Sequence, residues 1–74
     1  MKVSYDRETD SLTITLRYDP ISESDEINPD IIADLAEDGS ILRFEILQAS
    51  KVVHEPDRMT FEIAEPVAAV AKSR

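Results

Sequence analysis

The sequence has no cysteine, no tryptophan and a single glycine, and these shortages exclude several kinds of functional site. Without cysteine there is no disulfide framework, no thiolate nucleophile and no cysteine zinc site. One glycine leaves no glycine-rich loop to hold a phosphate. The lone histidine, His54, cannot make a zinc site, because such sites take three or four ligands. We therefore expect no catalytic residues, no resident metal and no cofactor.

Basic residues are also scarce. The chain has 8 lysines and arginines and 16 acidic residues, which gives a net charge of −8. A surface of this charge repels the phosphates of nucleic acids and the headgroups of anionic membranes. No apolar run reaches the roughly 20 residues of a membrane span, and no apolar signal region opens the chain. We expect a cytoplasmic protein with no direct nucleic-acid or membrane partner. A basic protein is the partner that this charge favours.

The length of 74 residues allows one domain, residues 1–74. A chain this short buries only about 60% of the surface that its unfolded form exposes. Such a small core is near the lower limit for independent folding, so we expect a homodimer.

A β-hairpin at residues 31–47 is the clearest structural signal. Two apolar runs, 31–36 and 41–47, flank a polar link that holds Gly39, the only glycine. Gly39 readily takes a positive φ, so the link fits a type I turn closed by a G1 bulge. Alternation in the second run places Leu42, Phe44 and Ile46 on the inner face and the charged residues between them outside. In the first run, Asp34 lies on the outer face.

The rest of the chain predicts further strands. Residues 2–5 and 11–16 alternate and form a first hairpin, and residues 21–27 suit a charged edge strand. Residues 58–63 alternate again, with Met59, Phe61 and Ile63 on one side. We predict a mainly β (α+β) fold, an antiparallel β-meander of five or six strands, with a short helical turn after Leu47. The pattern Glu65-Pro66 followed by small apolar residues predicts a short C-terminal helix, for which docking on the chain's own sheet and a seam with a second copy or a partner are equal alternatives.

The densest acidic cluster contains Glu23, Asp25 and Glu26. It could be the docking strip of a basic partner or a weak divalent-metal site with oxygen ligands. The alternative is a solvated edge that discourages aggregation, and charge runs usually have that role. The cluster has no EF-hand spacing.

A second group lies on the outer face of the central hairpin and contains Asp34, Arg43 and Glu45. Two carboxylates there could act as an acid and base pair. A cross-strand ion-pair ladder is the favoured alternative, because no nucleophile can be named beside them. We take the six residues of the two groups as the candidate partner-binding set. Tyr5 and Tyr18 are expected to pack, and Ser50 to cap the helical turn.

Several short motifs occur in an order typical of one small prokaryotic family. They are Met1-Lys2-Val3, Tyr5-Asp6, Asp10-Ser11-Leu12, Ile14, Leu16, the acidic run 22–26, Ile31-Ile32, Asp34, Glu37-Asp38-Gly39, Phe44-Glu45-Ile46-Leu47 and Ala49-Ser50. In this order they resemble the uncharacterised domain of unknown function 2283, over residues 1–52. Residues 53–74, with the extra strand and short helix, fall outside the resemblance. Arg43 departs from the pattern, because the family commonly has a small residue there.

The resemblance implies a short cytoplasmic protein without an assigned activity or established catalytic residues. Some members are encoded beside small basic proteins that resemble RNA-cleaving toxins, which implies an antitoxin-like role for those members. The first hypothesis is therefore a non-catalytic acidic module that neutralises a small basic protein. The alternative is a homodimer that binds a small molecule or a divalent metal. A hydrolytic enzyme ranks last, because no activated nucleophile is visible.

Overall fold

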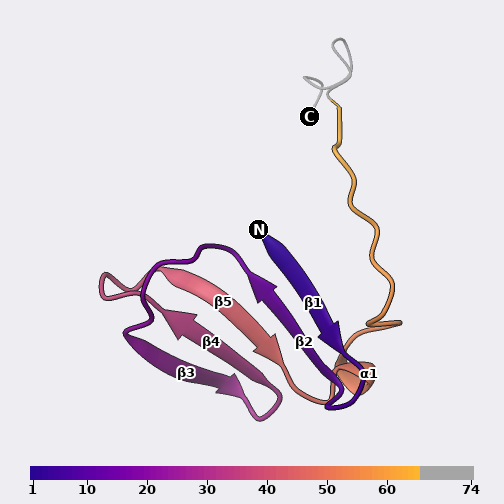
Figure 1. The fold of residues 1–74 in the computed structure, drawn as a ribbon, viewed down its shortest axis with the longest axis horizontal. Coiled ribbons are helices and arrows are strands. Elements are labelled where there is room, and N and C mark those ends of the chain that lie inside the picture. Colours follow the sequence, from indigo (N-terminus) through magenta and orange to yellow (C-terminus); the bar gives the residue numbers. More distant parts are fainter. Residues whose placement is uncertain (66–74) are drawn as a thin grey trace, which may run out of the picture.

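The computed structural model describes residues 1–65 and consists of one five-stranded sheet, one short helix and an extended terminal segment (Figure 1). The strands are β1 (Lys2–Asp6), β2 (Ser11–Thr15), β3 (Glu23–Asn28), β4 (Ile31–Leu35) and β5 (Ile41–Ile46), and the helix is α1 (Ala49–Val52). All neighbouring strands are antiparallel. The mainly β fold and the helical turn after Leu47 are therefore confirmed.

The strand order β1-β2-β5-β4-β3 contains one crossover that a simple meander lacks. Residues 16–22 leave β2 and pass the ends of β5 and β4 before β3 begins at the far edge (Figure 1). Hydrogen bonds hold this crossover at both ends. At its start, the N–H groups of Leu16 and Arg17 donate to the Leu42 carbonyl, and at its end the Ser22 N–H donates to the Leu35 carbonyl. As a result, β1 and β3 form opposite edges of the sheet.

The turn at Gly39 joins β4 to β5 as the sequence predicts. Gly39 has a φ of 89°, and its N–H donates to the Ala36 carbonyl at 2.9 Å. The Ala36 N–H donates in turn to the Ser40 carbonyl at 2.8 Å. These two bonds define the expected type I turn with a G1 bulge, in which only glycine takes the positive φ at no steric cost.

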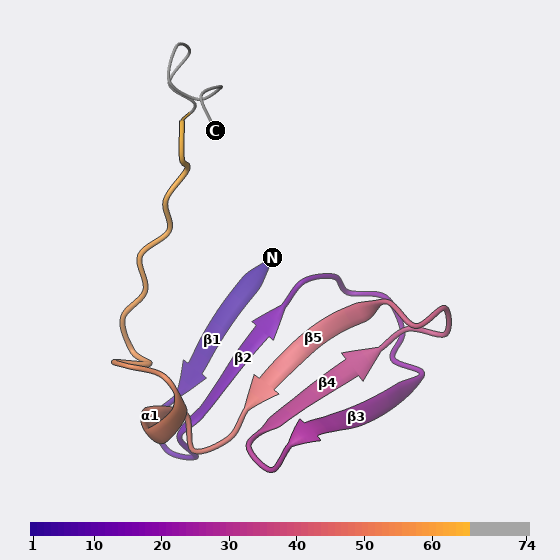
Figure 2. The ribbon, with the colours of Figure 1, turned by 180° about the vertical axis from the view of Figure 1, so that it is seen from behind.

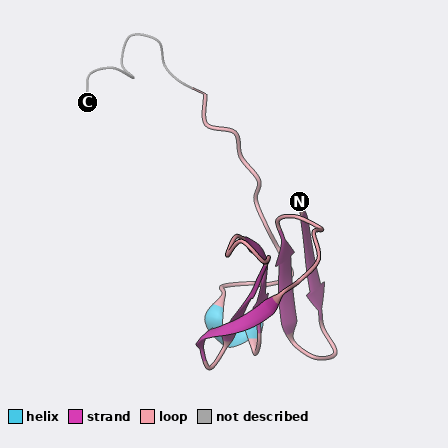
Figure 3. Cartoon of the chain, turned by 90° about the vertical axis from the view of Figure 1, so that its left-hand side faces the viewer, coloured by secondary structure: helices cyan, strands magenta, loops and turns pink. Residues whose placement is uncertain are grey.

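The sheet has one apolar face, built from two rows of residues in register. The rows are Val3, Ile14, Phe44 and Ala33, and Tyr5, Leu12, Ile46 and Ile31. Helix α1 packs on this face at the β1–β2 end, where Ala49 is fully buried (Figures 2 and 3). Only four apolar residues are buried in the described part of the chain, and two of them, Leu12 and Ala33, belong to these rows. Much of the apolar face is therefore half-exposed.

The alternation predicted for β5 fails at Leu42. The register shifts between Asp34 and Leu35, because Asp34 pairs with Arg43 while Leu35 pairs with Ile41. Leu42 is the extra residue of this bulge, and an extra residue breaks the alternation of sides. Leu42 consequently lines the same hollow as Arg43 and is 1% exposed.

The sixth strand predicted at residues 58–63 is absent, and this expectation is wrong for the single chain. After a turn in which Glu55 has a φ of 53°, the chain leaves the sheet as an extended trace (Figures 1 and 2). We call residues 58–65 the arm. Its apolar residues Met59, Phe61 and Ile63 are 62%, 71% and 70% exposed. The helix predicted after Glu65 lies outside the described residues.

Candidate functional site

A polar row crosses the face of the sheet opposite to α1. Register places Ser24, Asp34, Arg43 and Thr15 side by side on four adjacent strands. The Asp34 carboxylate is at the centre, because it accepts a hydrogen bond from Ser24 Oγ at 2.5 Å and one from Arg43 Nε at 2.6 Å. Arg43 Nη2 lies 2.6 Å from the same Asp34 oxygen. Of the ion-pair ladder predicted for Asp34, Arg43 and Glu45, the structure contains this one pair, and Glu45 forms no ion pair within residues 1–65.

Asp34 is buried although it lies on the polar face, since its side chain is 5% exposed against 40% for Arg43. Burial alone raises the pKa of Asp34, but the hydrogen bonds from Ser24 and Arg43 and the guanidinium charge outweigh it, so that the pKa lies below its ordinary value. Asp34 is therefore ionised at neutral pH and fixed in place. It serves as an anchor for Arg43 rather than as a free acid or base.

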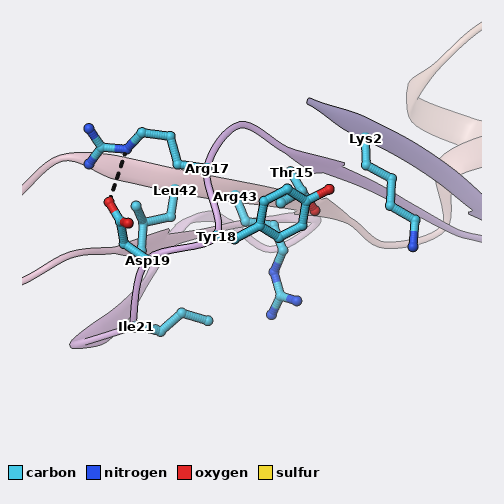
Figure 4. Close-up of a pocket in the computed structure, with 8 residues that line it drawn as sticks. All are labelled: Lys2, Thr15, Arg17, Tyr18, Asp19, Ile21, Leu42 and Arg43. Atoms are coloured by element: carbon cyan, nitrogen blue, oxygen red, sulfur yellow. Dashed lines mark ion pairs between the residues drawn. The ribbon is translucent and has the colours of Figure 1, made fainter.

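A hollow of about 320 Å³ opens beside this pair (Figure 4). The crossover provides Arg17 and Tyr18, β1 provides Lys2, and β5 provides Arg43. Figure 4 shows Arg17 directed at Asp19, and their charged groups are 3.5 Å apart at an exposed site. Three cationic side chains therefore line one hollow in a chain of net charge −8, and two of them, Arg17 and Arg43, are paired with Asp19 and Asp34. Sequence reasoning missed this grouping, because the crossover is what brings Arg17 to β1 and β5.

The carboxylates of Glu23, Asp25 and Glu26 lie along β3, and we call these three residues the acidic edge. All six residues of β3 are exposed. β3 pairs with β4 along one edge, and within residues 1–65 no strand pairs with its other edge. None of the three carboxylates forms an ion pair with any residue in 1–65. The free side of β3 therefore combines unpaired backbone groups with uncompensated negative charge.

The six residues of the candidate set do not form a single patch. Glu26 shares a row of the polar face with Glu45, with Ile32 between them. Glu23 and Asp25 have the other parity and project toward the opposite side of β3. The structure thus separates an exposed edge at β3 from a locked pair at Asp34 and Arg43, and Glu45 is half-buried between them.

A third polar cluster ties the first hairpin to α1. The Asp10 carboxylate accepts hydrogen bonds from the Tyr5 hydroxyl at 2.7 Å, from Ser50 Oγ at 2.7 Å and from the Ser50 N–H at 3.1 Å. The Asp10 carbonyl accepts one from the Ala49 N–H at 2.8 Å. Asp10 therefore caps α1 from the β1–β2 turn, whereas the preceding residue Gln48 provides no side-chain cap.

Asp10 is a structural residue that sequence reasoning missed, although the motifs Tyr5-Asp6, Asp10-Ser11 and Ala49-Ser50 contain all its partners. The hydrogen bond from Tyr5, followed by that from Ser50, lowers the pKa of Asp10. The same bond to Asp10 raises the pKa of Tyr5. Ser50 thus uses its hydroxyl as a donor to Asp10, and not as the cap of its own helix.

We expect Asp10→Asn to lower the stability at neutral pH and to remove part of its acid dependence. A carboxylate with a lowered folded pKa contributes stability above its unfolded value of about 4, and loses it as pH falls through the folded value. Urea midpoints of the two proteins should therefore differ most near neutral pH and converge on acidification. Asp25→Asn is the control for loss of one charge, because Asp25 is exposed on β3. A gap that stays constant with pH would contradict this role.

His54 lies in the loop after α1, where its side chain is 95% exposed and its Nε2 is 3.7 Å from Glu55. Within residues 1–65, no three histidine or acidic side chains are arranged to hold a metal ion. In the same residues, no helix has the length and apolar character needed to cross a membrane.

The chain matches the model of a known protein family. The model of a family described as "Protein of unknown function (DUF2283)" matches residues 2–50, from β1 into the first turn of α1. Neither the curated proteins nor the solved structures contain a significant match to the chain. The arm lies outside the matched residues.

Proposed function

Because the chain belongs to the DUF2283 family of proteins of unknown function, its role has to be inferred from its own surfaces, and we propose a cytoplasmic, non-catalytic interaction module. In this proposal the acidic edge binds a small basic protein, and the chain acts as an antitoxin does toward its partner. The observation that carries the proposal is the exposed strand β3, with three carboxylates that lack ion pairs within residues 1–65.

The geometry of an edge strand supports this choice of surface. An extended segment of a partner can pair with the free backbone groups of β3, while alternate side chains provide specificity. Glu23 and Asp25 project to one side of the strand and Glu26 to the other. A basic segment added to β3 would therefore meet carboxylates on both faces of the sheet.

The same charges discourage the wrong partner. An acidic edge resists pairing with a second acidic edge, which is the usual protection of natural sheets against aggregation. A lysine- or arginine-rich strand experiences attraction at that position instead. The acidic edge thus supplies both parts of specificity, attraction for a basic chain and repulsion of another copy of β3.

The test uses as its probe the protein encoded by the neighbouring reading frame, co-expressed with the full chain. We expect a short basic protein that co-purifies at low salt and dissociates at high salt, because exposed charge pairs are screened. The variant E23Q/D25N/E26Q should weaken the complex about tenfold, as three exposed pairs together contribute on the order of 1–2 kcal/mol.

The matched control is E8Q/E55Q/E65Q, which removes three exposed carboxylates far from β3 along the chain. This control should leave the affinity within about twofold, since the remote charges contribute only to the general field. Equal weakening by both variants would show that net charge acts rather than β3. A neighbour that is not basic, or no complex at low salt, would overturn the proposal.

A second candidate function is favoured by the hollow beside Arg43. Lys2, Arg17 and Arg43 line this hollow, and Asp34 and Asp19 already pair with the two arginines. The remaining positive charge suits a small anionic molecule better than a divalent cation, because like charges repel. Calorimetry with a panel of small carboxylates and phosphates tests this alternative, with Arg17→Gln as the variant expected to lose binding. Heat changes with divalent cations, and none with anions, would reverse the choice of ligand.

A further inference from the structure

The arm carries a strand sequence that has no strand beside it in the part of the chain that the structure describes. Residues 58–63 alternate between polar and apolar, and Met59, Phe61 and Ile63 are more than 60% exposed. β1 pairs with β2 along one edge, and within residues 1–65 no strand pairs with its other edge. One copy of the chain therefore presents both an unpaired strand sequence and an unpaired sheet edge.

The two sequences are complementary in one antiparallel register. When Lys2 is set opposite Glu62, Val3 meets Phe61, Ser4 meets Thr60, Tyr5 meets Met59, and Asp6 meets Arg58. Both terminal pairs join opposite charges, and the inner pairs match apolar with apolar and hydroxyl with hydroxyl. Cross-strand pairs of these kinds each stabilise a sheet by about 0.2–1 kcal/mol.

The same register agrees with the two faces of the sheet. Met59 and Phe61 would extend the apolar face beyond Tyr5 and Val3, while Thr60 and Glu62 would continue the polar face. In a single copy, residues 56–59 line a hollow of about 200 Å³ with Val3, Tyr5 and Leu12, and an exchange would give the places of residues 58 and 59 to the arm of the other copy. Asp57 is also paired with Arg7, 3.1 Å apart, directly after β1.

Charge selects β1 over the other edge. Residue Glu62 of an incoming arm would face Lys2 on β1, whereas on β3 it would be placed among the carboxylates of the acidic edge. Like charges directly opposite destabilise a sheet. The edge that fits the arm is thus the edge that the proposed function leaves free.

We propose that two copies of the chain form a two-fold dimer by exchanging arms, with residues 58–62 of each copy added as a sixth strand to β1 of the other. The extended course of the arm, away from its own sheet in Figures 1 and 3, is the conformation that such an exchange requires. Each exchange covers apolar surface on both chains and satisfies the backbone groups of one edge. The inference goes beyond the proposed function and is independent of it.

A pair of charge-reversed variants tests the exchange. Lys2→Glu places like charges in both contacts of its homodimer, and Glu62→Lys does the same. We expect each variant alone to dimerise about tenfold or more weakly than the natural chain by sedimentation. An equimolar mixture of the two restores attraction in both contacts, so it should form a heterodimer as tightly as the natural homodimer.

Alternative arrangements give different results in the same experiment. An arm that closes on its own β1 gives a monomer, no heterodimer in the mixture, and recovery of stability only in the double variant K2E/E62K. A dimer through another surface gives variants that dimerise normally. Either result overturns the exchange.

Phe61→Asp tests the exchange in a variant that should stay folded, because the Phe61 side chain is 71% exposed in the single copy and does not support the core. We expect this variant to keep the circular dichroism of the β core and to sediment as a monomer. Glu65→Gln, a surface change just beyond the paired residues, is its control and should remain dimeric. A dimeric Phe61→Asp would contradict the proposal. Binding of a basic protein to β3 tests the proposed function instead and is measured in a separate experiment.

Discussion

Leu42→Ala is expected to lower the free energy of unfolding by about 3 kcal/mol, since removal of a fully buried leucine side chain typically costs 2–5 kcal/mol. Leu42 is the largest side chain that is fully buried in the described part of the chain. The bulge in β5 directs it under the crossover, where its own carbonyl accepts the N–H groups of Leu16 and Arg17. Urea unfolding followed by circular dichroism gives the measurement.

The control for Leu42→Ala is the neighbouring change Ile41→Ala. Ile41 lies in the same strand but is 40% exposed, so a similar loss of aliphatic carbon should cost about 1 kcal/mol. Leu42→Met, which conserves volume, should cost less than about 1.5 kcal/mol. Equal losses for Leu42→Ala and Ile41→Ala would show that the crossover does not pack on β5 as described.

Arg43→Met is expected to destabilise the fold by about 2 kcal/mol at neutral pH, because it leaves the buried Asp34 carboxylate with Ser24 as its remaining hydrogen-bond donor. The methionine keeps most of the aliphatic packing of the arginine stem. Without the guanidinium the pKa of Asp34 rises, so the carboxyl takes up a proton at a higher pH than in the natural protein. The difference in unfolding free energy should therefore shrink as pH falls.

A double change separates charge from packing. Asp34→Asn removes the buried charge, so Arg43→Met should cost less in that background than in the natural chain. The interaction energy in this cycle should be on the order of 1–2 kcal/mol. A penalty that is the same at every pH and in both backgrounds would mean that the ion pair contributes nothing to stability.

Local patterns of the sequence predicted the five observed strands, but they also predicted a strand at residues 58–63 that the single chain does not form. Alternation in the runs 11–16 and 41–47 predicts β2 and β5, although the alternation fails at Leu42, and the single glycine predicts the turn between β4 and β5. Each of these signals depends on neighbours in the chain. A residue pattern with period two or a required positive φ is visible without knowledge of the rest of the fold.

Features that depend on distant residues were not predictable in the same way. The pairing of β2 with β5 joins residues about thirty positions apart, and no local pattern specifies it. Asp10 meets Ser50 across 40 positions. Asp34 was placed on the outer face correctly, but its burial follows from Ser24 and Arg43 on the neighbouring strands. The arm shows the opposite case, because its pattern is that of a strand while a single chain offers it no partner in the described structure.

The crossover also determines how the chain can reach its folded state. The strand pairs β1·β2, β3·β4 and β4·β5 join neighbours in sequence, whereas β2·β5 is the contact that unites the two halves. The two halves can form early as separate units, because their loops are short and cost little entropy to close. Docking of β2 on β5 then closes the longest loop of the sheet, so this late step should limit the folding rate. Changes at this seam are expected to alter the folding rate more than equal changes in the outer strands.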